Sequence, residues 1–135
     1  VISNVAPAAV VELVQLLATQ QFEQAEALKN ALTPLLGLVT VSTTEKTPFG
    51  TVTARFRNPS AIKALMTILG LPCGGCRRPL GRMTLNAIQV VLEAARKVQA
   101  ANPEILGPCA EFFGVDVDAR LNDPNAWKDL VYSEY

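Results

Sequence analysis

The chain has 135 residues, half of them hydrophobic, and its 12 basic residues balance its 12 acidic ones. This length suits one domain with an ordinary core, and a chain without net charge has no field that attracts nucleic acid or an anionic membrane surface. Aromatic residues make up only 6% of the chain, too few for the stacking platform of a single-strand binder. We therefore expect neither a nucleic-acid partner nor a membrane partner.

Targeting and redox signals are weak. The first residues, Val1–Asn4, include no initiator Met and no basic n-region, so they do not resemble a secretory signal. No apolar run reaches the ~18–20 residues that cross a bilayer. The three cysteines are an odd number and do not form a neat disulfide framework. The expected location is the reducing cytoplasm.

Residues 1–37 predict one short strand and two helices. Val1–Ser3 is short and apolar, as in a buried strand. From Ala8 to Ala18 apolar residues cover much of a helical circumference, so this helix is expected to pack on more than one side. From Phe22 to Leu36 apolar residues recur at spacings of three and four, which predicts a second amphipathic helix. The two should be antiparallel and joined near Thr19–Gln21.

Residues 38–57 change period. Leu38–Thr43 and Thr51–Phe56 are rich in β-branched residues and partly alternate, with Pro48 and Gly50 between them. Proline and glycine at this place favour a turn, so a hairpin fits. An extended or partly helical loop fits equally well, because a two-stranded hairpin is marginal unless it packs on something else.

Residues 58–135 return to helical patterning. Asn58 can cap a helix that has Pro59 in its first turn, and Gly70 can adopt the left-handed conformation that ends it. Thr84 can cap a longer helix.

Two later motifs have the same combination of residues as Asn58-Pro59. Asn102-Pro103 and Asp123-Pro124 each combine a capping residue with a first-turn proline, which predicts a helix through Phe112 and a last one through Trp127. The whole chain is therefore expected to hold one strand followed by five to seven helices.

The leading strand is the odd element of this pattern. Buried backbone groups must be paired, and a lone strand next to helices leaves both of its edges open. It would fit as the last strand of a parallel barrel whose other strands lie outside these residues. Since a complete (β/α)₈ barrel needs ~250 residues, this chain is expected to be only a part of one.

A succession of motifs carries a family resemblance: Asn58-Pro59, Leu69-Gly70-Leu71-Pro72, Gly74-Gly75 and Arg78-Pro79-Leu80. Their order resembles the C-terminal region of the dihydrodipicolinate synthase and N-acetylneuraminate lyase family, the class I pyruvate-dependent aldolases. The resemblance implies a mostly α-helical chain: residues 1–37 as the last β/α unit of a TIM barrel, residues 38–57 as an inserted loop or hairpin, and residues 58–135 as a C-terminal helical cap.

The resemblance also implies a function, that of a fragment or subunit of a Schiff-base-forming lyase. Members of the family bind pyruvate on a barrel lysine, relay protons through a tyrosine and use no cofactor. Such a lysine must be a neutral amine in a desolvated setting, whereas the lysines here lie on polar helix faces or in loops: Lys29, Lys46, Lys63, Lys97 and Lys128. The implied partners are pyruvate, an aldehyde, the remaining barrel polypeptide and further copies in a homo-oligomer.

Ser3 and Asn4 are the residues expected nearest to a substrate. At the C-terminal end of a barrel strand, side chains face the mouth where such enzymes work, so both can help to hold a substrate carboxylate. The alternative is that Ser3 packs in the barrel and Asn4 caps the following helix.

Cys73 and Cys76 form a C-x-x-C motif in an expected loop. A thioredoxin-like role needs the motif at the start of a helix, and a structural zinc site needs four ligands, while the chain has no histidine and one other cysteine. A tight Gly-Gly turn is the simpler interpretation. The neighbouring Arg77, Arg78 and Arg82 either bind an anion or make structural pairs. With no catalytic constellation visible, a stand-alone, non-catalytic helical interaction module is the alternative function.

Overall fold

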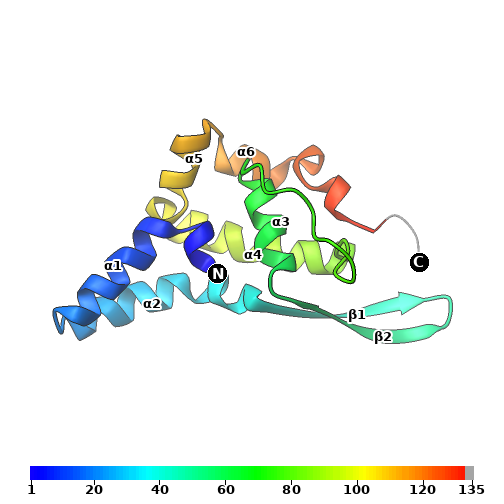
Figure 1. Cartoon of the computed structure of the whole chain (residues 1–135), viewed down its shortest axis with the longest axis horizontal. Helices are drawn as coiled ribbons and strands as arrows, with labels where there is room; N and C mark the ends of the chain where they lie inside the picture. Colours follow the sequence, from blue (N-terminus) through cyan, green and yellow to red (C-terminus); the bar gives the residue numbers. More distant parts are fainter. Residues whose placement is uncertain (133–135) are drawn as a thin grey trace.

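The computed structural model describes residues 1–132 and is mostly helical, with one small antiparallel sheet. Figure 1 shows α1 and α2 at one end of an elongated molecule and the β1–β2 hairpin at the other. The helices and strands are α1 (Pro7–Ala18), α2 (Phe22–Leu36), β1 (Thr40–Thr47), β2 (Gly50–Arg57), α3 (Ser60–Ile68), α4 (Leu85–Ala101), α5 (Gly107–Phe113) and α6 (Val117–Asn122). Short 3₁₀ helices are η1 (Ile2–Asn4), η2 (Gly37–Val39), η3 (Pro103–Ile105), η4 (Pro124–Ala126) and η5 (Lys128–Leu130).

The predicted strand at Val1–Ser3 is wrong, because this segment forms the 3₁₀ helix η1. Its backbone bonds stay local: the Val5 and Ala6 N–H groups both donate to the Ile2 carbonyl at 2.9 Å. A strand would need neighbouring strands to pair with, and the only sheet among residues 1–132 lies elsewhere. A turn satisfies the same groups without partners.

Helices α1 and α2 confirm the antiparallel pair, and their connection falls at the predicted Thr19–Gln21. Figure 1 shows the two running in opposite directions. Pro34 lies in the last turn of α2, which ends two residues later at Leu36. The helix runs through this proline, whose missing N–H removes one bond to the preceding turn.

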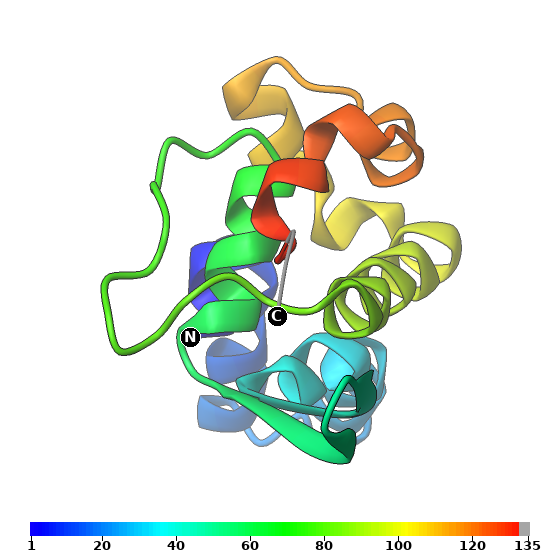
Figure 2. The ribbon, with the colours of Figure 1, turned by 90° about the vertical axis from the view of Figure 1, so that its right-hand side faces the viewer.

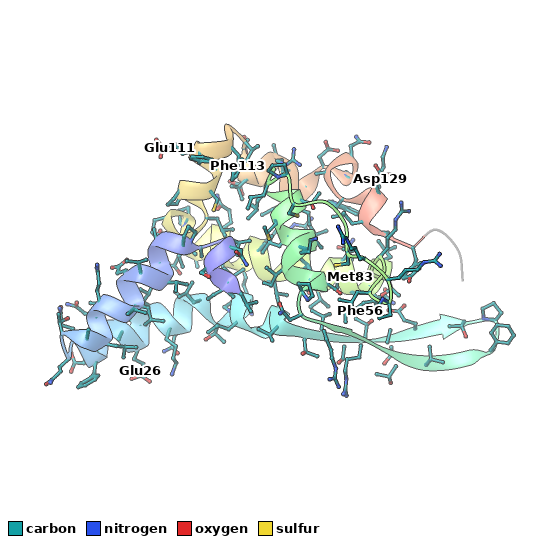
Figure 3. The ribbon with its side chains drawn as sticks, viewed as in Figure 1. Glu26, Phe56, Met83, Glu111, Phe113 and Asp129 are labelled. Carbon is teal, nitrogen blue, oxygen red and sulfur yellow. The ribbon has the colours of Figure 1, made fainter. Side chains whose placement is uncertain are left out.

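Residues 40–57 form a hairpin, so the hairpin alternative is the correct one. β1 and β2 pair in register from Thr40 opposite Arg57 to Thr47 opposite Gly50, with Pro48 and Phe49 in the turn. Because side chains alternate across a strand, Val41 faces the helices and is 3% exposed. Phe56 lies at the base of the hairpin, where the sheet meets the helical body (Figure 3).

Helix α3 begins at Ser60, and Asn58 does not cap it, which corrects the sequence prediction. The Asn58 N–H donates instead to the Val39 carbonyl at 2.8 Å, so this residue extends the hairpin ladder. The predicted exit is confirmed: Gly70 has φ +88°, and the Leu71 N–H returns to the Met66 carbonyl at 2.9 Å, as in a Schellman-type end.

Helix α4 lies at the centre of the fold and confirms the Thr84 cap, since the Ala87 N–H donates to the Thr84 hydroxyl at 3.2 Å. Figure 2 looks nearly along α4, which lies at one side of the view with α3 beside it, and α4 packs against α2, α3, α6 and β1. One continuous core joins η1, α2, β1, α3, α4 and α6. Its largest side chains with almost no exposure include Leu32, Leu35, Ile62, Leu65, Ile68, Ile88, Leu92 and Leu121.

The C-terminal part differs from the prediction in two places. Asn102 lies at the N-cap position of η3 but makes no side-chain capping bond; its side-chain N–H donates to the Glu104 carboxylate at 3.2 Å. Helix α6 was not predicted, although Asp116 caps it by accepting from the Ala119 N–H at 2.9 Å. The Asp123 cap is confirmed on η4, where its carboxylate accepts from the Asn125 N–H.

Candidate functional site

The N-terminal turn holds both residues predicted to lie near a substrate. Ser3 and Asn4 are exposed, and the Asn4 amide donates to the Val1 carbonyl at 3.0 Å. The alternative role of Asn4 as a cap is wrong, because α1 has Ala6 at its N-cap position without a side-chain bond. The turn therefore presents Ser3 and Asn4 side by side on the surface.

Buried residues hold this turn in place. Val5 and Ala6 are fully buried, and the Val5 carbonyl accepts a hydrogen bond from the Cys109 thiol at 3.2 Å. Burial raises the pKa of Cys109, which keeps the thiol protonated and able to donate. Ser3 and Asn4 thus sit on a rigid support although they themselves face solvent.

Helix α1 exposes an apolar face beside this turn. Val11 is 56% exposed, Val14 60% and Leu17 49%, and their spacing of three places them on one side of the helix. The opposite side, which includes Ala9, packs on the core. Apolar residues on both sides are the pattern of a helix packed between two layers, and the described residues supply one of them.

The Cys73–Cys76 segment is a loop, as predicted, and it is fastened to α3. The Cys73 thiol lies 3.3 Å from the Thr67 hydroxyl and 3.4 Å from the Lys63 carbonyl. The Lys63 ammonium donates to the Gly75 carbonyl at 2.9 Å. Figure 2 shows this segment as a wide loop beside α3. Cys73 and Cys76 are both free, half-buried thiols.

A cavity of about 300 Å³ opens between α3 and this loop. It is lined by Lys63, Thr67, Cys76, Arg82 and Asp129, among others. Two cations suit a small anion, but the Lys63 ammonium already binds the Gly75 carbonyl, and Asp129 offsets part of the positive charge. The cavity lining within residues 1–132 includes no histidine, the base that pairs with the thiol in Cys–His nucleophiles. Within residues 1–132 no group of three His, Cys, Asp or Glu side chains is placed to hold a metal ion.

The predicted basic cluster does not make structural pairs among the described residues. Arg77, Arg78 and Arg82 are exposed. The arginines that connect helices are two others. Arg120 donates to the carbonyls of Thr67 and Ile68 at the end of α3, and Arg96 donates to the Leu121 carbonyl at 2.6 Å. Both satisfy carbonyls near a helix end, groups that lack partners within the helix.

A buried carboxylate was not among the residues that the sequence pattern indicated. Glu45 on β1 is 4% exposed. One of its oxygens accepts from the Thr43 and Thr84 hydroxyls, each at 2.6 Å, and the other accepts from the Asn86 amide at 2.9 Å. The carboxylate lies at the N-terminus of α4, where the helix dipole favours negative charge. This cluster, the Glu45 anchor, fastens the hairpin to the helical body.

The alternation along β1 could have revealed this residue. Glu45 lies two and four residues after Thr43 and Val41, so a strand puts all three on one face. An acidic residue on a buried face is rarely left without partners.

No protein-family model, curated protein or solved structure matches this chain. The family resemblance therefore remains a prediction based on the order of motifs. In residues 1–132 no helix is both long and apolar enough to cross a membrane.

Proposed function

We propose that this chain is the C-terminal part of a Schiff-base-forming lyase similar to dihydrodipicolinate synthase, in which it closes a TIM barrel and supplies a helical cap. The observation that supports this proposal is the uncovered apolar face of α1, formed by Val11, Val14 and Leu17. Fully burying one such side chain is worth about 1.5–3 kcal/mol. A neighbouring barrel helix and strand are the cover that the proposal supplies.

In the proposed enzyme the chemistry belongs to upstream polypeptide. A lysine there attacks the ketone carbon of pyruvate and releases water to form the Schiff base. The Schiff base loses a proton from its methyl carbon to become an enamine, and that carbon then adds to the aldehyde, whose oxygen takes up a proton. Ile2–Asn4 keeps its 3₁₀ turn, and the exposed Ser3 and Asn4 on it are the residues of this chain whose donors face the barrel mouth and contact a substrate carboxylate. The proposed enzyme is cytoplasmic, homo-oligomeric and free of cofactors.

Borohydride trapping of the complete protein tests this proposal. Incubation with pyruvate followed by reduction should fix pyruvate on one lysine, and peptide mapping should locate that lysine upstream of residue 1. The four exposed lysines (Lys29, Lys46, Lys97 and Lys128) and the half-buried Lys63 should remain unmodified. An adduct on any of these five, or no adduct at all, contradicts the proposal.

A binding experiment tests the role of α1 separately. Val14→Asp puts a charge on the uncovered face and should abolish association with the upstream polypeptide expressed as a separate chain, because a buried unpaired carboxylate is very costly. Val90→Asp on α4 is the matched control, since Val90 is also exposed, at 37%, and lies outside that face. Equal binding by both variants would remove the support that α1 gives.

One observation favours the alternative, a stand-alone and non-catalytic helical interaction module. Ile2 is 8% exposed and joins the chain's own core, so the N-terminal segment is accommodated without further strands. The native mass separates the two functions. A module would be isolated without a companion polypeptide, whereas the lyase requires the barrel.

A further inference from the structure

The β1–β2 hairpin extends from the helical body as an arm. Figure 1 shows its tip beyond the helices, and both views place β2 at the lower margin of the molecule. Phe49 in the turn is 96% exposed and Val52 46% exposed. A two-stranded hairpin is marginally stable without further packing, and the exposed tip and outer edge of this arm leave room for a partner surface.

The outer edge of β2 has unpaired backbone groups. In an antiparallel pair, residues whose N–H and C=O point to the partner alternate with residues whose groups point away. The Asn58 N–H donates to the Val39 carbonyl, which makes Val39–Asn58 a hydrogen-bonded pair. Counting along the register, Thr53 opposite Thr44 is then a non-hydrogen-bonded pair.

An independent contact agrees with this assignment of hydrogen-bonded and non-hydrogen-bonded pairs. The Thr44 carbonyl accepts from the Asn86 amide, at 3.5 Å, so it points away from β2. The N–H and C=O of Thr53, and by alternation those of Thr51, Arg55 and Arg57, therefore point away from β1. Within the described part of the chain, these outward-pointing N–H and C=O groups of β2 have no hydrogen-bond partner.

We propose that β2 pairs antiparallel with β2 of a second copy of this chain, around a two-fold axis at Thr53, to form a four-stranded intermolecular sheet. A two-fold axis makes such an interface self-complementary, and exposed strand edges are templates for this kind of addition. In this register Thr53 faces Thr53 of the second copy. A residue that lies some positions before Thr53 faces the residue that lies the same number of positions after Thr53 in the second copy.

The side chains of β2 fit this register. Arg55 faces Thr51 of the second copy, and Arg57 faces Phe49, so no two cations lie opposite each other and Arg57 gains a cation–π contact. Phe56 faces Gly50, the combination in which an aromatic ring covers a strand glycine. Since the axis lies in the distal half of the arm, the two helical bodies stay apart.

Sedimentation equilibrium on the 135-residue chain and two proline variants tests the proposal. Thr53→Pro removes the central outward N–H of β2 without removing a bond to β1, because proline lacks this donor. Ser42→Pro is the matched control: Ser42 faces Arg55 across the hairpin, so its N–H points outward from the opposite edge. We expect a dimer for the unchanged chain and for Ser42→Pro, and at least a tenfold weaker dimer for Thr53→Pro, with unchanged circular dichroism.

A cross-link tests the register without relying on a proline variant. In a Cys73→Ser, Cys76→Ser background, Thr53→Cys should form an intermolecular disulfide on mild oxidation, since paired Cα atoms of a hydrogen-bonded pair lie about 5.5 Å apart. Ser42→Cys in the same background should not. A monomeric chain, equal dissociation by both proline variants, or no cross-link at Thr53 would each overturn the pairing. Pyruvate trapping does not affect any of these readouts, so this inference and the proposed function fail separately.

Discussion

The helical body and the hairpin are held by different forces. In the body, Leu32 of α2, Leu65 of α3 and Leu92 of α4 are all fully buried in one apolar core. The hairpin adds Val41 and the half-buried Phe56 to that core, and its main fastening is the Glu45 anchor. Figure 3 shows how far the hairpin continues beyond Phe56.

This difference teaches that the two regions should respond to different substitutions. Apolar packing is roughly proportional to buried area and is spread over many contacts. A buried carboxylate depends on a few donors, and losing one partner leaves the rest uncompensated. Substitutions in the body should therefore lower global stability, and substitutions in the anchor should first loosen the arm.

The largest effect is expected in the body. Leu92→Ala leaves a cavity in the core and should lower the free energy of unfolding by about 2–5 kcal/mol. Leu85→Ala on the same helix is the control, because Leu85 is 50% exposed and its loss should cost at most about 0.5 kcal/mol. Urea denaturation measures both. Similar costs for the two would mean that α4 does not form the centre of the core.

A second substitution tests the exit of α3. Gly70 has φ +88°, and a Cβ there would lie 2.8 Å from a methyl carbon of Val115. Gly70→Ala should therefore cost about 1–3 kcal/mol through backbone strain and this clash. Gly107→Ala is the matched control, because Gly107 has open space around a new Cβ. Thermal unfolding of the two variants would contradict the Schellman-type exit if their midpoints agreed.

The anchor is expected to act on the hairpin. Glu45→Ala leaves the Thr43 and Thr84 hydroxyls without their acceptor and should cost about 1–3 kcal/mol. Hydrogen exchange should accelerate most in the residues of β1 and β2, since local opening follows the loss of buried contacts. Lys46→Ala, the exposed neighbour on β1, should leave both stability and exchange unchanged. Uniform acceleration across α3 and α4 would show that the hairpin and the body unfold as one unit.

The parts of the fold that sequence reasoning predicted are those set by local rules. The helical periods gave α1, α2, α3 and α4, and the chemistry of Gly70 and Thr84 gave an exit and a cap that the structure confirms. These features depend on neighbours within a turn or two, so a single sequence contains them.

The features that could not be predicted from the sequence depend on residues far apart in the chain. The carboxylate of Glu45 meets the Thr84 hydroxyl across 39 positions, and Arg120 reaches the end of α3 across more than 50. Asn58 fits a cap by local rules, but the hairpin ladder continues to Asn58, and α3 begins at Ser60 with Pro59 at its N-cap position. Val1–Ser3 has the composition of a strand, yet strand pairing needs partners that local patterning does not reveal.

The smallest effect is expected at the contact between Thr84 of the helical body and Glu45 of the hairpin. Thr84 caps α4 and donates to Glu45, so Thr84→Ala should cost about 0.5–2 kcal/mol as a lost cap, while Thr84→Ser keeps the hydroxyl and should restore most of it. In a Glu45→Ala background the hydroxyl no longer has its acceptor, and removing it should cost less. A double-mutant cycle in urea should therefore give a coupling energy of at least about 0.5 kcal/mol. Strict additivity would mean that the Thr84 cap and the Glu45 anchor act independently.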